Sequence, residues 1–272
     1  MTFVNGVLAG ATDVALVPFS ALPPMVGLIV VSLATAIVML LVFKRTSDQA
    51  RLNAIKRSIH AGLFEIRLFN DDFRAIARAQ LEILRDNAKY LSLSLVPMLW
   101  VIVPLVLVIA QLQFHYGYAP LRAGEDVLLK VQLRRGTGDA VSIDMPPHLQ
   151  LETPAVWLPG AREVVWRVRP TEAGRYDMRV NVGADEHHAK SIFVAGGVVR
   201  RSPVRLERTF LNQLLYPSEP PLPDEGSVNA ITIAYEEQDV AIFGWELNWM
   251  VWYFVLSLVF AFALKKPLGV TI

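Results

Sequence analysis

Three apolar runs, each long enough to cross a membrane, constrain the fold of this chain more than any other feature of its sequence. The first two runs contain no charged residue, and the third contains one, Glu246. About 20 helical residues span the hydrocarbon core of a bilayer. We therefore predict three transmembrane helices, at residues 23–43, 91–113 and 242–264.

The first run could instead belong to a signal peptide. Residues 1–22 contain no Lys or Arg, however, and the run is longer than the hydrophobic part of a signal peptide, about 7–15 residues. We therefore expect a retained span. The whole chain is 53% hydrophobic and 19% charged. Soluble proteins average about half and about a quarter, and the excess here is concentrated in the three runs.

The distribution of Lys and Arg predicts which segments face the cytoplasm, because basic residues near the ends of a span stay on that side. Residues 44–90 contain ten basic and six acidic residues, whereas residues 1–22 contain one charge, Asp13. The tail, 265–272, begins with two lysines. We expect residues 44–90 and the tail to be cytoplasmic, and 1–22 and 114–241 to be external, in a bacterial inner membrane.

The cytoplasmic segment has apolar residues at helical spacing in two stretches, which predicts a coiled-coil-like helical hairpin. We expect its first helix to continue the first span without interruption. Asn70, Asp71 and Asp72 are candidate N-caps for the second helix. The hairpin is either a solvated connection or a docking arm for a ribosome or nascent chain. The candidate docking residues are Lys44, Arg45, Arg51, Lys56 and Arg57.

The external segment alternates apolar and polar residues between turn signals, which is typical of β-strands. We predict an immunoglobulin-like β-sandwich over about residues 119–195. Tyr176 follows a turn and resembles the corner tyrosine of that fold, whose hydroxyl bonds back to the chain. Residues 200–216 suggest a short amphipathic helix, and 228–235 one more strand. The fold class is thus a membrane protein of mixed α and β structure.

A search for chemistry finds no nucleotide-binding, metalloprotease or nucleophile-elbow motif, and the chain has no Cys. His187 and His188 are adjacent and are better read as a solvated pair than as a metal site. We expect no catalytic residues, no metal and no cofactor. The net charge of +1 gives no reason to expect DNA as a partner.

Polar residues within the predicted spans are the remaining candidates for function, because a polar group in hydrocarbon is costly. Ser32 and Thr35 are three residues apart and share one helical face. Each hydroxyl could simply bond to its own helix. Alternatively, these side chains line a groove, for which the candidates are Ser32, Thr35, Ser92, Ser94, Gln111, Asn248 and Ser257.

The order of the segments, with the stretch Pro97-Met-Leu-Trp-Val-Ile-Val-Pro104 in the second span, resembles the YidC/Oxa/Alb insertase superfamily. The three-span branch is most similar, which includes archaeal YidC-like proteins and the insertase subunit of the endoplasmic-reticulum membrane protein complex. The resemblance covers residues 23–113 and, loosely, 243–264. Residues 64–72 and 265–270 also resemble bacterial membrane proteins to which no activity is assigned.

The resemblance implies a membrane-protein insertase whose groove lowers the cost of moving short polar segments through lipid. Its partners would be lipids, nascent membrane proteins and the ribosome. Two features depart from the family: the spans contain no basic residue, and the β-domain falls between the second and third spans. The alternative is a non-catalytic envelope interaction protein that binds an external protein partner through its β-sandwich.

Overall fold

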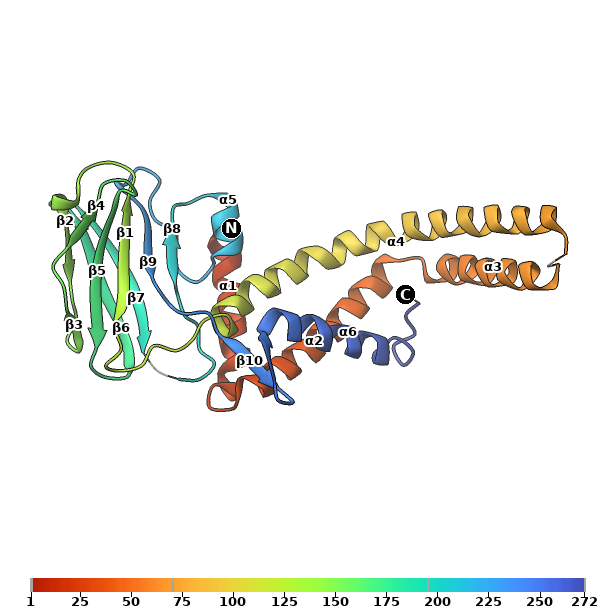
Figure 1. Ribbon diagram of the computed structural model, residues 1–272, viewed down its shortest axis with the longest axis horizontal. Helices are drawn as coiled ribbons and strands as arrows, with labels where there is room; N and C mark the ends of the chain where they lie inside the picture. Colours follow the sequence, from red (N-terminus) through yellow and green to blue (C-terminus); the bar gives the residue numbers. More distant parts are fainter. Residues whose placement is uncertain (1, 70, 195, 272) are drawn as a thin grey trace. The chain divides into compact units, whose positions relative to one another are not determined.

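The computed structural model describes residues 2–69, 71–194 and 196–271, and within these ranges the chain forms six α-helices and several antiparallel sheets (Figure 1). Asn70, one of the predicted N-caps, lies outside the described residues. The chain divides into two compact units, one of residues 1–28 with 107–252 and one of 29–106 with 253–272. The helices are α1 (Thr2–Leu16), α2 (Pro24–Thr46), α3 (Gln49–Leu68), α4 (Phe73–Tyr116), α5 (Phe210–Leu215) and α6 (Trp249–Leu264).

Two helices are long and apolar enough to cross a membrane, as predicted for the first two runs. They are α2, with 23 residues, and the part of α4 from residue 76 to 116. The α4 helix is continuous over 44 residues although Pro97 and Pro104 lie inside it. Asp72 accepts a hydrogen bond from the Arg74 amide at 2.9 Å, so the predicted N-cap of this helix is confirmed at that residue.

The predicted helix at 242–264 begins later than expected. Residues 239–248 instead form a two-stranded hairpin of β10 (Asp239–Ile242) and β11 (Trp245–Asn248). Its turn residues Phe243 and Gly244 both have positive φ, 53° and 83°, which is the conformation of a tight hairpin turn. Asn248 then accepts a hydrogen bond from the Met250 amide at 3.0 Å, and α6 follows with 16 residues.

The expectation that one helix continues from the first span into the hairpin is wrong. Asp48 leaves the helical conformation, with φ −79° and ψ 88°, and its side chain accepts a hydrogen bond from the Arg51 amide. The hydroxyls of Thr46 and Ser47 bond to carbonyls of the preceding turn. Three residues that prefer helix ends therefore end α2 and begin α3.

The β-strands form two main sheets, both antiparallel. One has the order β3-β5-β1-β9-β8, with β4 also paired to β5, and the other has the order β2-β6-β7 (Figure 1). The strands are β1 (Val127–Leu133), β2 (Val141–Asp144), β3 (Leu149–Leu151), β4 (Val156–Leu158), β5 (Glu163–Pro170), β6 (Gly174–Val182), β7 (Glu186–Val194), β8 (Val204–Leu206) and β9 (Val228–Ile233).

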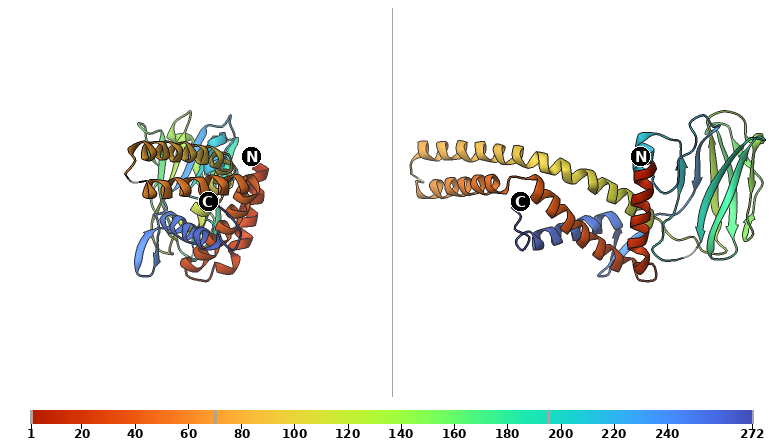
Figure 2. Two further views of the ribbon diagram at one scale, coloured as in Figure 1. Left: turned by 90° about the vertical axis from the view of Figure 1, so that its right-hand side faces the viewer. Right: turned by 180° about the vertical axis from the view of Figure 1, so that it is seen from behind.

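The two sheets pack face to face and share one core (Figure 2). Alternate residues of β1 are buried, from Val127 to Leu133, as are Met178 and Val180 of β6 in the other sheet. Each fully buried Val or Leu contributes about 1.5–3 kcal/mol. The hydroxyl of Tyr176 donates to the Glu172 carbonyl at 3.1 Å, so the predicted bond back to the chain is confirmed.

The predicted β-domain at 119–195 ends too early, because β9 pairs with β1 in the middle of the larger sheet. The predicted strand at 228–235 is thus part of this domain. The predicted amphipathic helix at 200–216 is mostly wrong: residues 204–206 form β8, and α5 has only six residues, capped by Thr209. The backbone of β8 bonds to β9, so sheet pairing overrides the helical spacing of its apolar residues.

Candidate functional site

Three of the groove candidates are buried hydroxyls without a hydrogen-bond partner among the described residues. They are Ser32, Ser94 and Ser257, one on each of α2, α4 and α6, and all three lie in the same unit. Ser32 is fully buried, and Thr35 on the same face is 7% exposed and interacts with Tyr253 of α6. Nearly all buried polar groups in folded proteins are paired, so three such hydroxyls in apolar helices require an explanation.

Of the remaining groove candidates, Ser92 and Asn248 have local roles. The Ser92 hydroxyl donates to the Lys89 carbonyl at 2.8 Å, as expected for a serine that bonds to its own helix. The side-chain oxygen of Gln111 is also buried without a partner among the described residues, but it lies in the unit that contains the β-sheets. Asn248 caps α6. Of these three residues, only Ser92 belongs to the unit that contains the buried hydroxyls.

The docking candidates lie at the end of α2 and in the first half of α3, and two of the five are engaged within the chain. Lys44 donates to the Leu268 carbonyl at 2.7 Å, and the Lys56 ammonium lies 5.4 Å from the centre of the Tyr90 ring. The other three are exposed: Arg45, Arg51 and Arg57.

The far end of the hairpin presents an apolar surface that basic-residue counting did not indicate. Five of its apolar side chains are 47–82% exposed: Leu63, Phe64, Leu68, Phe69 and Phe73. A soluble protein seldom exposes such a cluster unless a partner covers it. This surface is therefore a candidate docking site in addition to the three exposed arginines.

A polar cluster in the other unit joins α1 to the end of α4. His115 is 3% exposed, and its Nδ1 lies 3.0 Å from the Gln111 carbonyl while its Nε2 lies 2.9 Å from Asp13 Oδ1. Arg200 Nε donates to the same Asp13 oxygen at 2.9 Å. Burial alone would raise the pKa of Asp13, but His115 and Arg200 hold it below its usual value.

A second cluster surrounds Lys190, which is fully buried on β7. Its ammonium donates to the carbonyl and hydroxyl oxygens of Ser202, each at 2.7 Å, and to Glu219. Burial lowers the pKa of Lys190 to about 8, against the opposing attraction of Glu219. Sequence reasoning missed this residue. The alternation of the strand could have revealed it, because Lys190 lies on the same face of β7 as the buried Ile192 and Val194.

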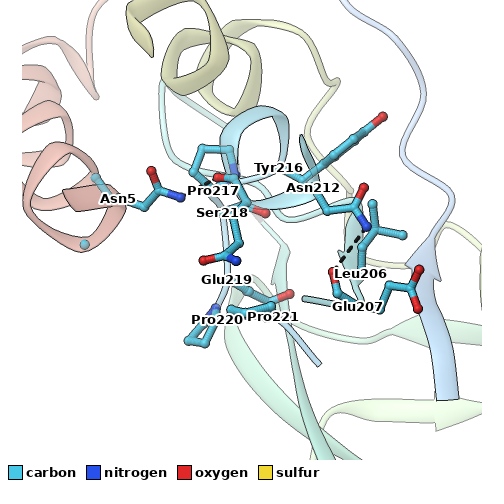
Figure 3. Close-up of a pocket in the computed structure, with 13 residues that line it drawn as sticks. Asn5, Leu206, Glu207, Asn212, Tyr216, Pro217, Ser218, Glu219, Pro220 and Pro221 are labelled. Atoms are coloured by element: carbon cyan, nitrogen blue, oxygen red, sulfur yellow. Dashed lines mark hydrogen bonds between the residues drawn. The ribbon is translucent and has the colours of Figure 1, made fainter. Parts of the chain in front are cut away.

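Two cavities adjoin these clusters. One of about 280 Å³ is lined by polar groups of both, including Asp13, His115, Arg200, Ser202 and Glu219. The other, of about 210 Å³, lies between α1 and the segment around α5. In Figure 3, Asn5 of α1 points toward Pro217 and Ser218, and the dashed line marks the bond from Asn212 to the Glu207 carbonyl. Such concave polar sites suit a small ligand or a peptide segment.

Comparison with family models, curated proteins and solved structures finds no match to this chain. The resemblance to the insertase superfamily therefore remains a prediction. Among the described residues, no three His, Asp or Glu side chains lie close enough to hold a metal ion.

Proposed function

We propose that this protein is a non-catalytic, insertase-like membrane protein in which α2, α4 and α6 form a polar path for short translocated segments. The observation that supports this proposal is the set of three unpaired hydroxyls, Ser32, Ser94 and Ser257. An unpaired polar group in an apolar environment is costly, at about 1–3 kcal/mol each. A substrate backbone or water that bonds to these hydroxyls would offset that cost.

The proposed topology has three spans, with residues 1–22 external and residues 44–90 cytoplasmic. α6 alone is about 24 Å long, which is short for a bilayer. Helical backbone bonds continue from Lys265 to Ala261 and from Leu268 to Leu264, which extends the helical path by about a turn. Lys265 and Lys266 would then reach the cytoplasmic headgroups. The external domain would be an immunoglobulin-like sandwich, as its Tyr176 corner suggests.

A photocrosslinking experiment tests the polar path. A photoreactive residue at Ser32, which is fully buried, should crosslink to nascent membrane proteins with short translocated tails. Val30 is a matched control, because it lies two residues away on α2 and is 41% exposed. Equal crosslinking to nascent chains from Ser32 and Val30 would contradict the proposal.

Removal of the three hydroxyls distinguishes an insertase from a protein whose helices only anchor it in the membrane. Replacement of Ser32, Ser94 and Ser257 by Ala should leave stability unchanged or slightly raised, because each unpaired polar group is lost. In an insertase, the same triple variant should insert short-tailed substrates more slowly. Full insertion activity in the triple variant would indicate that the three helices serve only as an anchor.

The second candidate is an envelope protein that binds an external partner, and the 280 Å³ cavity favours it. Arg175 and Ser218 line this cavity. If the protein acts by binding a partner in this cavity, the double variant Arg175→Glu, Ser218→Arg should lose its activity in cells. A photoreactive residue at Ser32 should then give no crosslink to nascent chains. Crosslinking from Ser32 together with an active double variant would exclude this candidate.

A further inference from the structure

The outward face of α1 is apolar, unlike that of a helix on the surface of a soluble protein. Its inward face carries the buried Leu16 together with two polar residues, Asn5 and the partly buried Asp13. Its exposed face is apolar, with Val7 at 56%, Val14 at 73% and, just after the helix, Val17 at 65% exposed. Helices that face water bury the apolar side and expose the polar side.

The polar groups of α1 are satisfied inside the protein. Asn5 Nδ2 donates to the Gln213 carbonyl, and Asp13 accepts from His115 and Arg200. Arg200 Nη2 also donates to the Ala9 carbonyl at 3.1 Å. These contacts fix the rotation of α1 about its axis. The apolar face is therefore held outward by the interior contacts.

We propose that the outward face of α1 lies in the lipid bilayer, at the boundary between headgroups and acyl chains. The helix has 15 residues, or about 22 Å, which is too short to span the hydrocarbon. It leads through a short 3₁₀ turn (Val17–Phe19) and residues 20–23 directly into the apolar helix α2. A short helix that turns its apolar face away from the protein and adjoins a span fits a position along the interface.

The β10–β11 hairpin, which belongs to the same unit, supports this placement. Two aromatic side chains at its turn are highly exposed, Phe243 at 87% and Trp245 at 70%. The hairpin directly precedes the apolar helix α6. An exposed Trp beside an apolar helix is typical of the membrane interface, and the adjacent Phe243 adds apolar surface there. The membrane interface would thus contact two segments of this unit: α1, which precedes the β-domain in the sequence, and the β10–β11 hairpin, which follows it.

The experiment uses single cysteines, because the chain has no Cys of its own. An environment-sensitive fluorophore on Val14→Cys is compared in proteoliposomes with the same label on Val38→Cys and Ser142→Cys. Val38 is 51% exposed on α2, and Ser142 is exposed on β2. Quenching is measured with lipids that carry a nitroxide at a shallow or a deep position, and with iodide in water.

The label at position 14 should show blue-shifted emission, loss of fluorescence with the shallow nitroxide lipid and little quenching by iodide. The label at position 38 should respond more to the deep nitroxide, and that at 142 only to iodide. Iodide quenching at 14 as strong as at 142 would overturn the proposal. So would a blue-shifted label at 14 that no nitroxide lipid quenches, because a protein surface would then cover the helix.

This inference rests on the proposed membrane insertion of α2. The label at position 38 tests that insertion separately from the interfacial placement of α1. Quenching by nitroxide lipid at 38 but not at 14 rejects the interfacial helix and leaves the spans in place. Absence of lipid quenching at both positions rejects membrane insertion itself. Stronger deep-lipid quenching at 14 than at 38 would also overturn the interfacial placement.

Discussion

At the scale of single residues, buried charge is the feature that most distinguishes the unit with the β-sheets. Lys190 is fully buried and donates all three of its protons, to Ser202 and Glu219. Glu219 also accepts from the Ser191 amide at 2.8 Å. The pair therefore ties β7 to the segments that precede and follow β8. Removal of one charge leaves the other buried and uncompensated.

Lys190→Ala should accordingly destabilise this unit by about 3–5 kcal/mol. Denaturant unfolding of the detergent-solubilised protein, followed by the far-ultraviolet β-sheet signal, measures the change. Lys190→Met with Glu219→Gln is the control, because it removes both charges and keeps similar volumes. The double variant should recover most of the lost stability, and equal losses in both would argue against the charge as the cause.

Acid should weaken the same region. Burial alone would raise the pKa of Glu219, but Lys190 holds it below the usual 4.5. Burial would likewise raise the pKa of Glu186, but His188 and Ser227 hold it below that value. Below that pH the unfolded chain binds more protons than the folded one, so stability is present above about pH 4.5 and lost as pH falls through the folded values. Glu219→Gln should flatten the decline of unfolding free energy, and an unchanged slope would contradict this assignment.

At the scale of elements, helices and strands with a clear apolar spacing were predicted from the sequence, whereas the pairing of strands distant in the chain was not. The apolar stretch of α2 and the alternation in β6 and β7 were both evident from spacing. The late strand β9 was recognised as a strand but not as part of the domain, because a pairing across about 100 residues leaves no local signal. Ser32, Ser94 and Ser257 were identified as candidates because hydroxyls stand out in apolar runs, whereas their lack of hydrogen-bond partners depends on three-dimensional packing.

The central place of β9 predicts how fragments behave. A fragment of residues 119–195 lacks β8 and β9 and exposes the edge of β1, so it should be disordered or aggregated. A fragment of residues 118–236 retains both sheets and should unfold cooperatively. Circular dichroism during thermal unfolding checks both. Cooperative unfolding of the shorter fragment would show that β9 is dispensable.

At the scale of the whole molecule, the proposed topology places α3 and the β-domain on opposite sides of a membrane. Ser58 on α3 and Ser142 on β2 are both exposed. Cysteines at these positions, in intact cells and in inverted vesicles, should react with a membrane-impermeant maleimide from opposite sides. Val26→Cys on α2 is a control that neither preparation should label. Reaction of both sites from one side would reject the three-span arrangement.

The residues that follow α6 set the order in which the molecule can be completed. Thr271 donates its amide to Gln49 at 2.6 Å and its hydroxyl to Asn53 at 2.9 Å, while Lys44 bonds to the Leu268 carbonyl. These contacts bridge the helix break at Asp48. Residues 268–271 follow α6 in the sequence, so they leave the ribosome after it and add these contacts to a break that is already capped locally by Thr46, Ser47 and Asp48. The bonds between the two sides of the break that involve the tail can therefore form only when translation has passed α6.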